Sequence, residues 1–143
     1  MPASSEHGSR IKKGLAFLSS PNTSGFHEQL VIEYFYCCLH MFEAAVYDFT
    51  PKPRPQHFYS HNDRTKFLST ARLDSNNPFF EVARDYEALR ELSEQARYLS
   101  PAGSQTYEPL RIPQDVNDAK QLHEDIKRHI AEQYRKRKKS TPW

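Results

Sequence analysis

Glycine is scarce in this sequence: only 4 of its 143 residues are glycine. All-β and doubly wound folds need glycine at tight turns and in phosphate-binding loops, so the scarcity argues against both classes. A P-loop, a dinucleotide fingerprint and a Ser-His-Asp pattern are also missing from the sequence. Nucleotide hydrolysis, redox chemistry and acyl transfer are therefore not expected.

The sequence also lacks a large excess of charge of either sign. Its 20 Lys and Arg residues oppose 18 Asp and Glu residues, giving a formal net charge of +2. The whole molecule is thus not an electrostatic nucleic-acid binder. The two cysteines, Cys37 and Cys38, are adjacent, and neighbouring side chains on a helix point about 100° apart, which disfavours a disulfide between them. We expect reduced, packed thiols in a cytoplasmic protein, and the N-terminal residues lack the apolar region of a secretory signal.

The longest apolar stretch covers residues 28–49 and predicts a helix that is apolar over most of its circumference. Such a helix must be covered by neighbours, so we place it at the centre of a bundle. Its charged residues argue against a membrane span. Its polar residues form one narrow line, here called the polar stripe: Glu33, Tyr36, His40 and Glu43. The stripe is interpreted either as a satisfied buried polar pair, His40 with Glu43, or as the lining of a cleft or dimer seam.

Four further helices are expected, at about residues 5–19, 61–71, 78–98 and from 113 onward. Alternating prolines exclude a helix between residues 50 and 59. Ser60 and Asp63 fit a capping box at the start of the 61–71 helix, and Pro113 opens the last helix. The sequence therefore predicts an all-α, up-and-down bundle of about five helices over residues 5–135, followed by a basic tail at 136–143.

Three motifs occur in a recognisable order. Residues 35–44 (FYCCLHMFEA) form an aromatic-rich helix segment with a histidine, Ser60-His61 places a histidine at the start of the next helix, and residues 86–89 (YEAL) are followed by 95–98 (QARY). Together these motifs resemble the HEPN-like family of helical bundles over roughly residues 5 to 135. The resemblance implies a homodimer that acts in toxin–antitoxin, defence or RNA-processing systems, with RNA, an antitoxin or a nucleotidyltransferase as partner.

Active members of that family are metal-independent ribonucleases whose signature is an arginine, four to six residues, then a histidine. Arg54 and His61 match this spacing. The histidine would exchange a proton with the 2′-hydroxyl or the leaving oxygen, and the arginine would steady the phosphate. Pro55, however, occupies a place that is often polar in the family, and such a pair also arises by chance at this composition. Whether the chain is an enzyme stays open, and no cofactor is expected.

His57, His61 and Asp63 could suggest a metal site, but His57 lies in the proline-rich segment, where helical i, i+4 geometry is not available. Capping and surface exposure explain these residues better. Arg90 and Arg97 lie on one helix face, where pairing with nearby carboxylates is preferred over phosphate binding. No metal ligands are therefore assigned from the sequence.

The clearest electrostatic feature is a run of five cations near the C-terminus: Arg135, Lys136, Arg137, Lys138 and Lys139. This basic run would attract RNA, DNA or an acidic partner in a salt-dependent manner. Its alternative is a solvated helix end, where cations also suit the helix dipole. The leading hypothesis is RNA binding with possible metal-independent endoribonuclease activity. The alternatives are a non-catalytic dimeric interaction or regulatory module and a small-molecule-binding bundle that uses the side with Tyr36, His40 and Tyr47 as a pocket wall.

Overall fold

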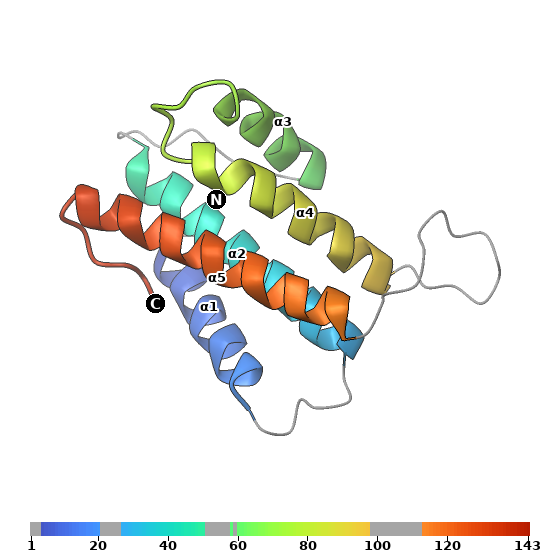
Figure 1. The fold of residues 1–143 in the computed structure, drawn as a ribbon. Coiled ribbons are helices and arrows are strands. Elements are labelled where there is room, and N and C mark those ends of the chain that lie inside the picture. Colours follow the sequence, from blue (N-terminus) through green and yellow to red (C-terminus); the bar gives the residue numbers. More distant parts are fainter. Residues whose placement is uncertain (1–3, 21–26, 51–57, 59, 98–112) are drawn as a thin grey trace.

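The computed structural model describes residues 4–20, 27–50, 58, 60–97 and 113–143. Within these ranges the chain forms five helices and no strand, which confirms the all-α prediction (Figure 1). The helices are α1 (Ser4–Leu18), α2 (His27–Phe49), α3 (His61–Ala71), α4 (Phe80–Arg97) and α5 (Gln114–Lys136).

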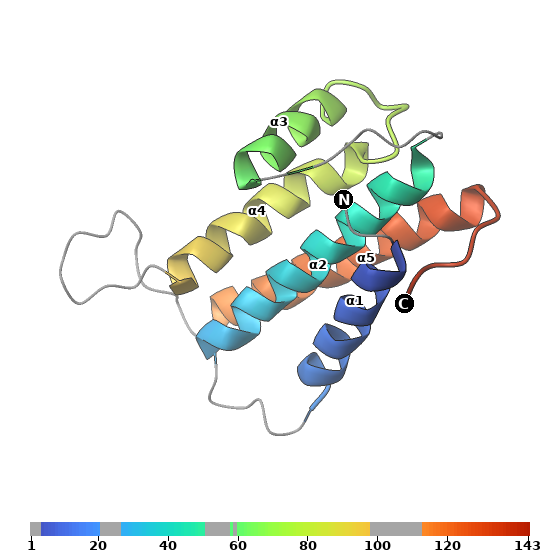
Figure 2. The ribbon, with the colours of Figure 1, turned by 180° about the vertical axis from the view of Figure 1, so that it is seen from behind.

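Helix α2 is the centre of the bundle, as its apolar circumference predicts. It packs against α1, α4 and α5, whereas α3 packs against α4. Figure 2 shows α2 in front of α5, with α1 on one side and α4 on the other. Helices α2 and α5 run in the direction opposite to α1 and α4, so the four long helices alternate up and down (Figure 1).

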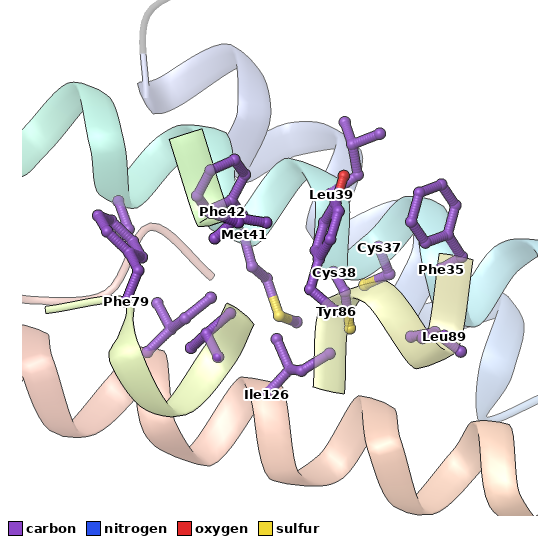
Figure 3. Close-up of a cluster of buried hydrophobic side chains, with 14 of the residues drawn as sticks. Phe35, Cys37, Cys38, Leu39, Met41, Phe42, Phe79, Tyr86, Leu89 and Ile126 are labelled. Atoms are coloured by element: carbon purple, nitrogen blue, oxygen red, sulfur yellow. The ribbon is translucent and has the colours of Figure 1, made fainter. Parts of the chain in front are cut away.

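The core is rich in aromatic rings around Phe42, which is fully buried in the middle of α2. Its ring centroid lies 5.2–5.7 Å from those of four other rings, Phe58, Phe67, Phe79 and Tyr86. Offset and edge-to-face contacts at these distances are favourable for aromatic pairs. Figure 3 shows Phe42, Phe79 and Tyr86 among buried side chains from α2, α4 and α5. The ring cluster fixes α3 and α4 against α2 and so places the residues at their ends.

Local signals set several helix ends. The Ser60 side chain accepts a hydrogen bond from the backbone N–H of Asp63 at 3.2 Å, so α3 begins at His61 as the capping box predicts. Helix α4 begins at Phe80, two residues later than expected. Asn77 delays it, because its side chain accepts a hydrogen bond from the backbone N–H of Phe79 at 2.9 Å and holds a turn there.

Helix α2 is the one helix in the described ranges that is long and apolar enough to cross a membrane by length and composition. Two thirds of its most apolar window, 67%, is buried inside the bundle. The core helix of a bundle meets the same criteria, so its composition is accounted for by packing.

The segment after α5 folds back onto the bundle. Lys138 takes a positive φ of 54°, which reverses the chain, and Lys139 Nζ donates a hydrogen bond to the carbonyl of Asp48 at 2.7 Å. Trp143 then lies against Tyr134, with ring centroids 6.0 Å apart. The residues expected as a basic tail thus lie beside the last turn of α2.

Candidate functional site

The polar stripe of α2 lies between side chains from α1 and from α3. His40 faces His7 of α1, with the two Nδ1 atoms 3.0 Å apart. His7 Nε2 lies 3.4 Å from Glu43 Oε2. Glu43 Oε1 accepts a hydrogen bond from Arg64 Nε of α3 at 2.5 Å. His40 and Glu43 therefore each contact a neighbouring helix. One continuous polar network inside the bundle is formed by the side chains of His7, His40, Glu43 and Arg64.

Burial keeps the histidines of this network neutral at pH 7. Removal from water lowers the pKa of His40 to about 4, with a further contribution from neighbouring His7. Burial also lowers the pKa of His7, and the charge of Glu43 only partly opposes the shift. Each neutral imidazole carries one N–H and one nitrogen lone pair. One ring donates its Nδ1–H to the Nδ1 lone pair of the other across the 3.0 Å contact, so one lone pair of the two is left for a proton or a metal ion.

A surface pocket of about 400 Å³ opens between α1 and α2 next to this network. The stripe contributes three of the lining residues, Glu33, Tyr36 and His40, and α1 contributes four: Arg10, Lys13, Gly14 and Phe17. Arg10 and Lys13 are exposed cations, and the ring of Phe17 is 40% exposed. The pocket therefore combines positive charge with one exposed aromatic ring.

Glu33 lines the pocket at a place where Gly14 leaves room for it. A Cβ atom on Gly14 would lie 2.7 Å from Glu33 Oε1, closer than side-chain carbons approach oxygen. Burial raises the pKa of the Glu33 carboxyl.

On the other side of the stripe, His61 occupies the first turn of α3. Its ring centroid lies 5.7 Å from that of Phe35, and its Nδ1 is buried with no hydrogen bond from the described residues. Burial lowers the pKa of His61, and the positive charges of Arg64 and Arg97 lower it further. Arg54, the expected catalytic partner of His61, lies outside the described residues.

The arginines of α4 divide into two groups. Arg90 forms ion pairs with Glu87 and Glu94 on its own helix, so the expected pairing is confirmed for this residue. Arg97 instead donates a hydrogen bond to the Tyr36 hydroxyl at 2.8 Å, and its guanidinium carbon lies 5.7 Å from the tyrosine ring centroid. Arg97 thus adds a cation beside the stripe.

The basic run lies at a different place, next to the end of α2. Arg135 pairs with Glu132, Arg137 stacks over the ring of Phe49 at 4.2 Å, and all five cations are exposed. His40 precedes Asp48 by eight residues, or about 12 Å of helix. The cations of the run are therefore separate from the pocket, and part of their bonding capacity is used within the chain.

Sequence reasoning missed His7 and Arg64. A signal for His7 was present, since it precedes buried Ile11 by four residues and so continues the apolar stripe of α1. Arg64 follows His61 by three residues, which places both on one face of α3.

No protein-family model matches the chain, and no curated protein or solved structure is significantly similar to it. The functional conclusion therefore rests on the site itself.

Proposed function

We propose that this chain is a HEPN-like, homodimeric, cytoplasmic protein that binds single-stranded RNA in the pocket between α1 and α2. The observation that carries the proposal is the composition of that pocket. Arg10 and Lys13 attract the phosphate backbone, the exposed ring of Phe17 is available for base stacking, and the half-buried Tyr36 lies beside it in the pocket. Unpaired RNA offers splayed bases and a flexible backbone, which suits a pocket of this kind better than a duplex does.

Cleavage by Arg54 and His61 is part of the proposal for the active form of the protein. His61 lies on the other side of the stripe from the pocket, next to Arg64 and Arg97, which would help to hold a phosphate there. A neutral imidazole at pH 7 is the form that accepts a proton from a 2′-hydroxyl.

A non-catalytic dimeric interaction module, with an antitoxin or nucleotidyltransferase as partner, is the second candidate. The observation in its favour is that polar groups near the stripe bind other residues of the chain instead of facing solvent. Arg64 is held by Glu43, and the imidazole of His61 is packed on Phe35. In that case the stripe would stabilise the bundle and bind no phosphate.

The binding test uses fluorescence anisotropy of a labelled single-stranded RNA across a salt series. The double variant Arg10→Gln/Lys13→Gln removes two pocket cations and is expected to weaken binding. The affinity should also fall less steeply with salt concentration, because binding would release about two counterions fewer. The matched control is Lys120→Gln/Arg128→Gln on α5, which makes the same charge change on exposed residues away from the pocket. Equal loss in both variants would contradict binding at the pocket.

The cleavage test measures RNA hydrolysis in excess EDTA by the native protein, Arg54→Ala and His61→Ala at matched dimer content. Cleavage that both substitutions abolish supports the ribonuclease. No cleavage above background, or cleavage unchanged by both substitutions, contradicts the ribonuclease, and absence of RNA binding as well favours the non-catalytic candidate.

A further inference from the structure

Three metal-ligating side chains meet where α1 crosses α2: His7, His40 and Glu43. One ligand atom from each lies within 4.8 Å of the other two. His7 comes from α1, whereas His40 and Glu43 come from α2. The fold brings the three together, so they do not form a motif in the sequence. Imidazole nitrogen and carboxylate oxygen are common ligands of Zn²⁺.

A second observation points to a ligand at the same place. His7 is only 1% exposed, yet its Nε2 makes no hydrogen bond within the described part of the chain, although Glu43 Oε2 is 3.4 Å away. Buried polar atoms in folded proteins almost always have a partner. An unpartnered nitrogen that faces a carboxylate is the arrangement that a bound cation would complete.

The spacing of His7 Nε2 and Glu43 Oε2 also fits one ion. With bonds of about 2.0–2.1 Å, two ligand atoms on a tetrahedral Zn²⁺ ion lie about 3.3 Å apart. His7 Nε2 and Glu43 Oε2 are 3.4 Å apart. Rotation of the His40 ring, which would give up its contact with His7 Nδ1, would bring one of its nitrogens to the same spacing.

We propose that His7, His40 and Glu43 bind one Zn²⁺ ion that joins α1 to α2. Arg64 holds Glu43 Oε1 and leaves Oε2 for the metal, as hydrogen-bonded outer groups do in many metal sites. His40 also lines the surface pocket, so a water molecule can supply the fourth ligand from that side. The ion would stabilise the contact between α1 and α2 without a catalytic role, and the proposal holds whether or not the chain binds RNA.

The competing account needs no metal. In it, one imidazole donates an N–H to the other, and His7 contacts Glu43 only weakly. The two accounts differ in what a metal does to the protein: Zn²⁺ stabilises the bundle in the first and has no saturable site in the second.

The test titrates the full-length, EDTA-treated protein with Co²⁺, a coloured substitute for Zn²⁺, under reducing conditions. The expected result is that each chain binds one Co²⁺ ion and shows the visible absorption bands of a low-symmetry Co²⁺ site. Addition of Zn²⁺ should displace the Co²⁺ and remove these bands. Cys37 and Cys38 are buried free thiols, and Cys38 Sγ lies 3.3 Å from His123 Nδ1, so they form the rival site. A sulfur-to-cobalt charge-transfer band in the near ultraviolet would identify that rival and overturn the proposal.

Variants locate the ligands. His40→Gln and His7→Gln are each expected to weaken Co²⁺ binding at least ten-fold and to abolish the rise in thermal midpoint that Zn²⁺ causes in the native protein. His129→Gln, a histidine on α5, is the matched control and should bind as the native protein does. Circular dichroism without metal verifies that each variant is folded, and His40→Gln alone suffices if His7→Gln unfolds. Absence of saturable binding, or unchanged affinity in a folded His40 variant, would overturn the proposal.

Discussion

Tyr134 donates a hydrogen bond to Asp48, with its hydroxyl oxygen 2.6 Å from Asp48 Oδ2. The bond joins the last turn of α5 to the last turn of α2, and Tyr134 is fully buried. Burial and the neighbouring carboxylate both raise the pKa of Tyr134, so the hydroxyl stays protonated and keeps donating. This contact fixes the end of the bundle from which the C-terminal segment folds back.

Tyr134→Phe is expected to lower the free energy of unfolding by about 1–2 kcal/mol, because it removes one hydrogen bond to a carboxylate and keeps the ring. Urea unfolding measures the change. Tyr36→Phe is the control, since the Tyr36 hydroxyl accepts an exposed hydrogen bond from Arg97, and it should change stability by less than about 0.5 kcal/mol. Equal effects of the two substitutions would show that the Tyr134–Asp48 bond contributes nothing particular.

Arg64→Met is expected to destabilise the protein by about 3 kcal/mol, because it leaves the buried carboxylate of Glu43 without its charged partner. Only 13% of the Arg64 side chain and 9% of the Glu43 side chain are exposed, so water replaces the lost contact poorly. Unfolding is measured in EDTA to exclude metal effects. The double variant Arg64→Met/Glu43→Gln should recover part of the loss, and a strictly additive double variant would contradict the coupling.

Acid is expected to destabilise the bundle through His123. This residue is 1% exposed, its Nδ1 lies 3.3 Å from Cys38 Sγ, and burial lowers its pKa from the reference value of 6.5. The unfolded chain therefore binds a proton that the folded chain does not. The stability from neutral His123 is present above pH 6.5 and is lost as the pH falls toward the lowered pKa.

The measurement compares unfolding of the native protein and His123→Gln at about pH 7.5 and about pH 5.5. The native protein should lose more stability between the two, by up to about 1.4 kcal/mol per pH unit for one proton. Other buried histidines act in both proteins and cancel in the comparison. The same pH dependence in both would show that His123 does not contribute.

Gly8→Ala is expected to displace the C-terminal segment. A Cβ atom on Gly8 would lie 2.5 Å from the carbonyl oxygen of Pro142, a backbone atom that can move only with its segment. Trp143 is the one tryptophan in the sequence, so its fluorescence should shift to longer wavelength as it leaves Tyr134. Gly14→Ala is the control, because its added Cβ meets the flexible end of Glu33 and should leave the emission unchanged.

Much of the fold follows from local signals in the sequence. The apolar circumference of α2 identifies it as the central helix, and Ser60 sets the start of α3. Periodicity shows which face of a helix is buried but not which helix covers it. The contact of His7 with His40, 33 residues apart, and that of Arg64 with Glu43 therefore could not be predicted. The return of the chain at Lys138 was missed because five consecutive cations resemble a solvated tail.

The stripe illustrates the same limit for the site. Its residues were found from the helical wheel, yet their chemistry depends on α1, which supplies Arg10, Lys13 and Phe17 to the pocket. None of these three residues forms a motif with the stripe in the sequence. The arrangement became visible only when α1 was placed beside α2.

Ultraviolet crosslinking of the native protein to a single-stranded RNA, followed by mass spectrometry of the crosslinked peptides, tests the central claim most directly. Aromatic side chains that stack on bases crosslink efficiently, so the account predicts crosslinks at Phe17 and Tyr36, lost on Arg10→Gln/Lys13→Gln. Crosslinks confined to the basic run at 135–139, or none above those of an inert control protein, would contradict RNA binding in the pocket between α1 and α2.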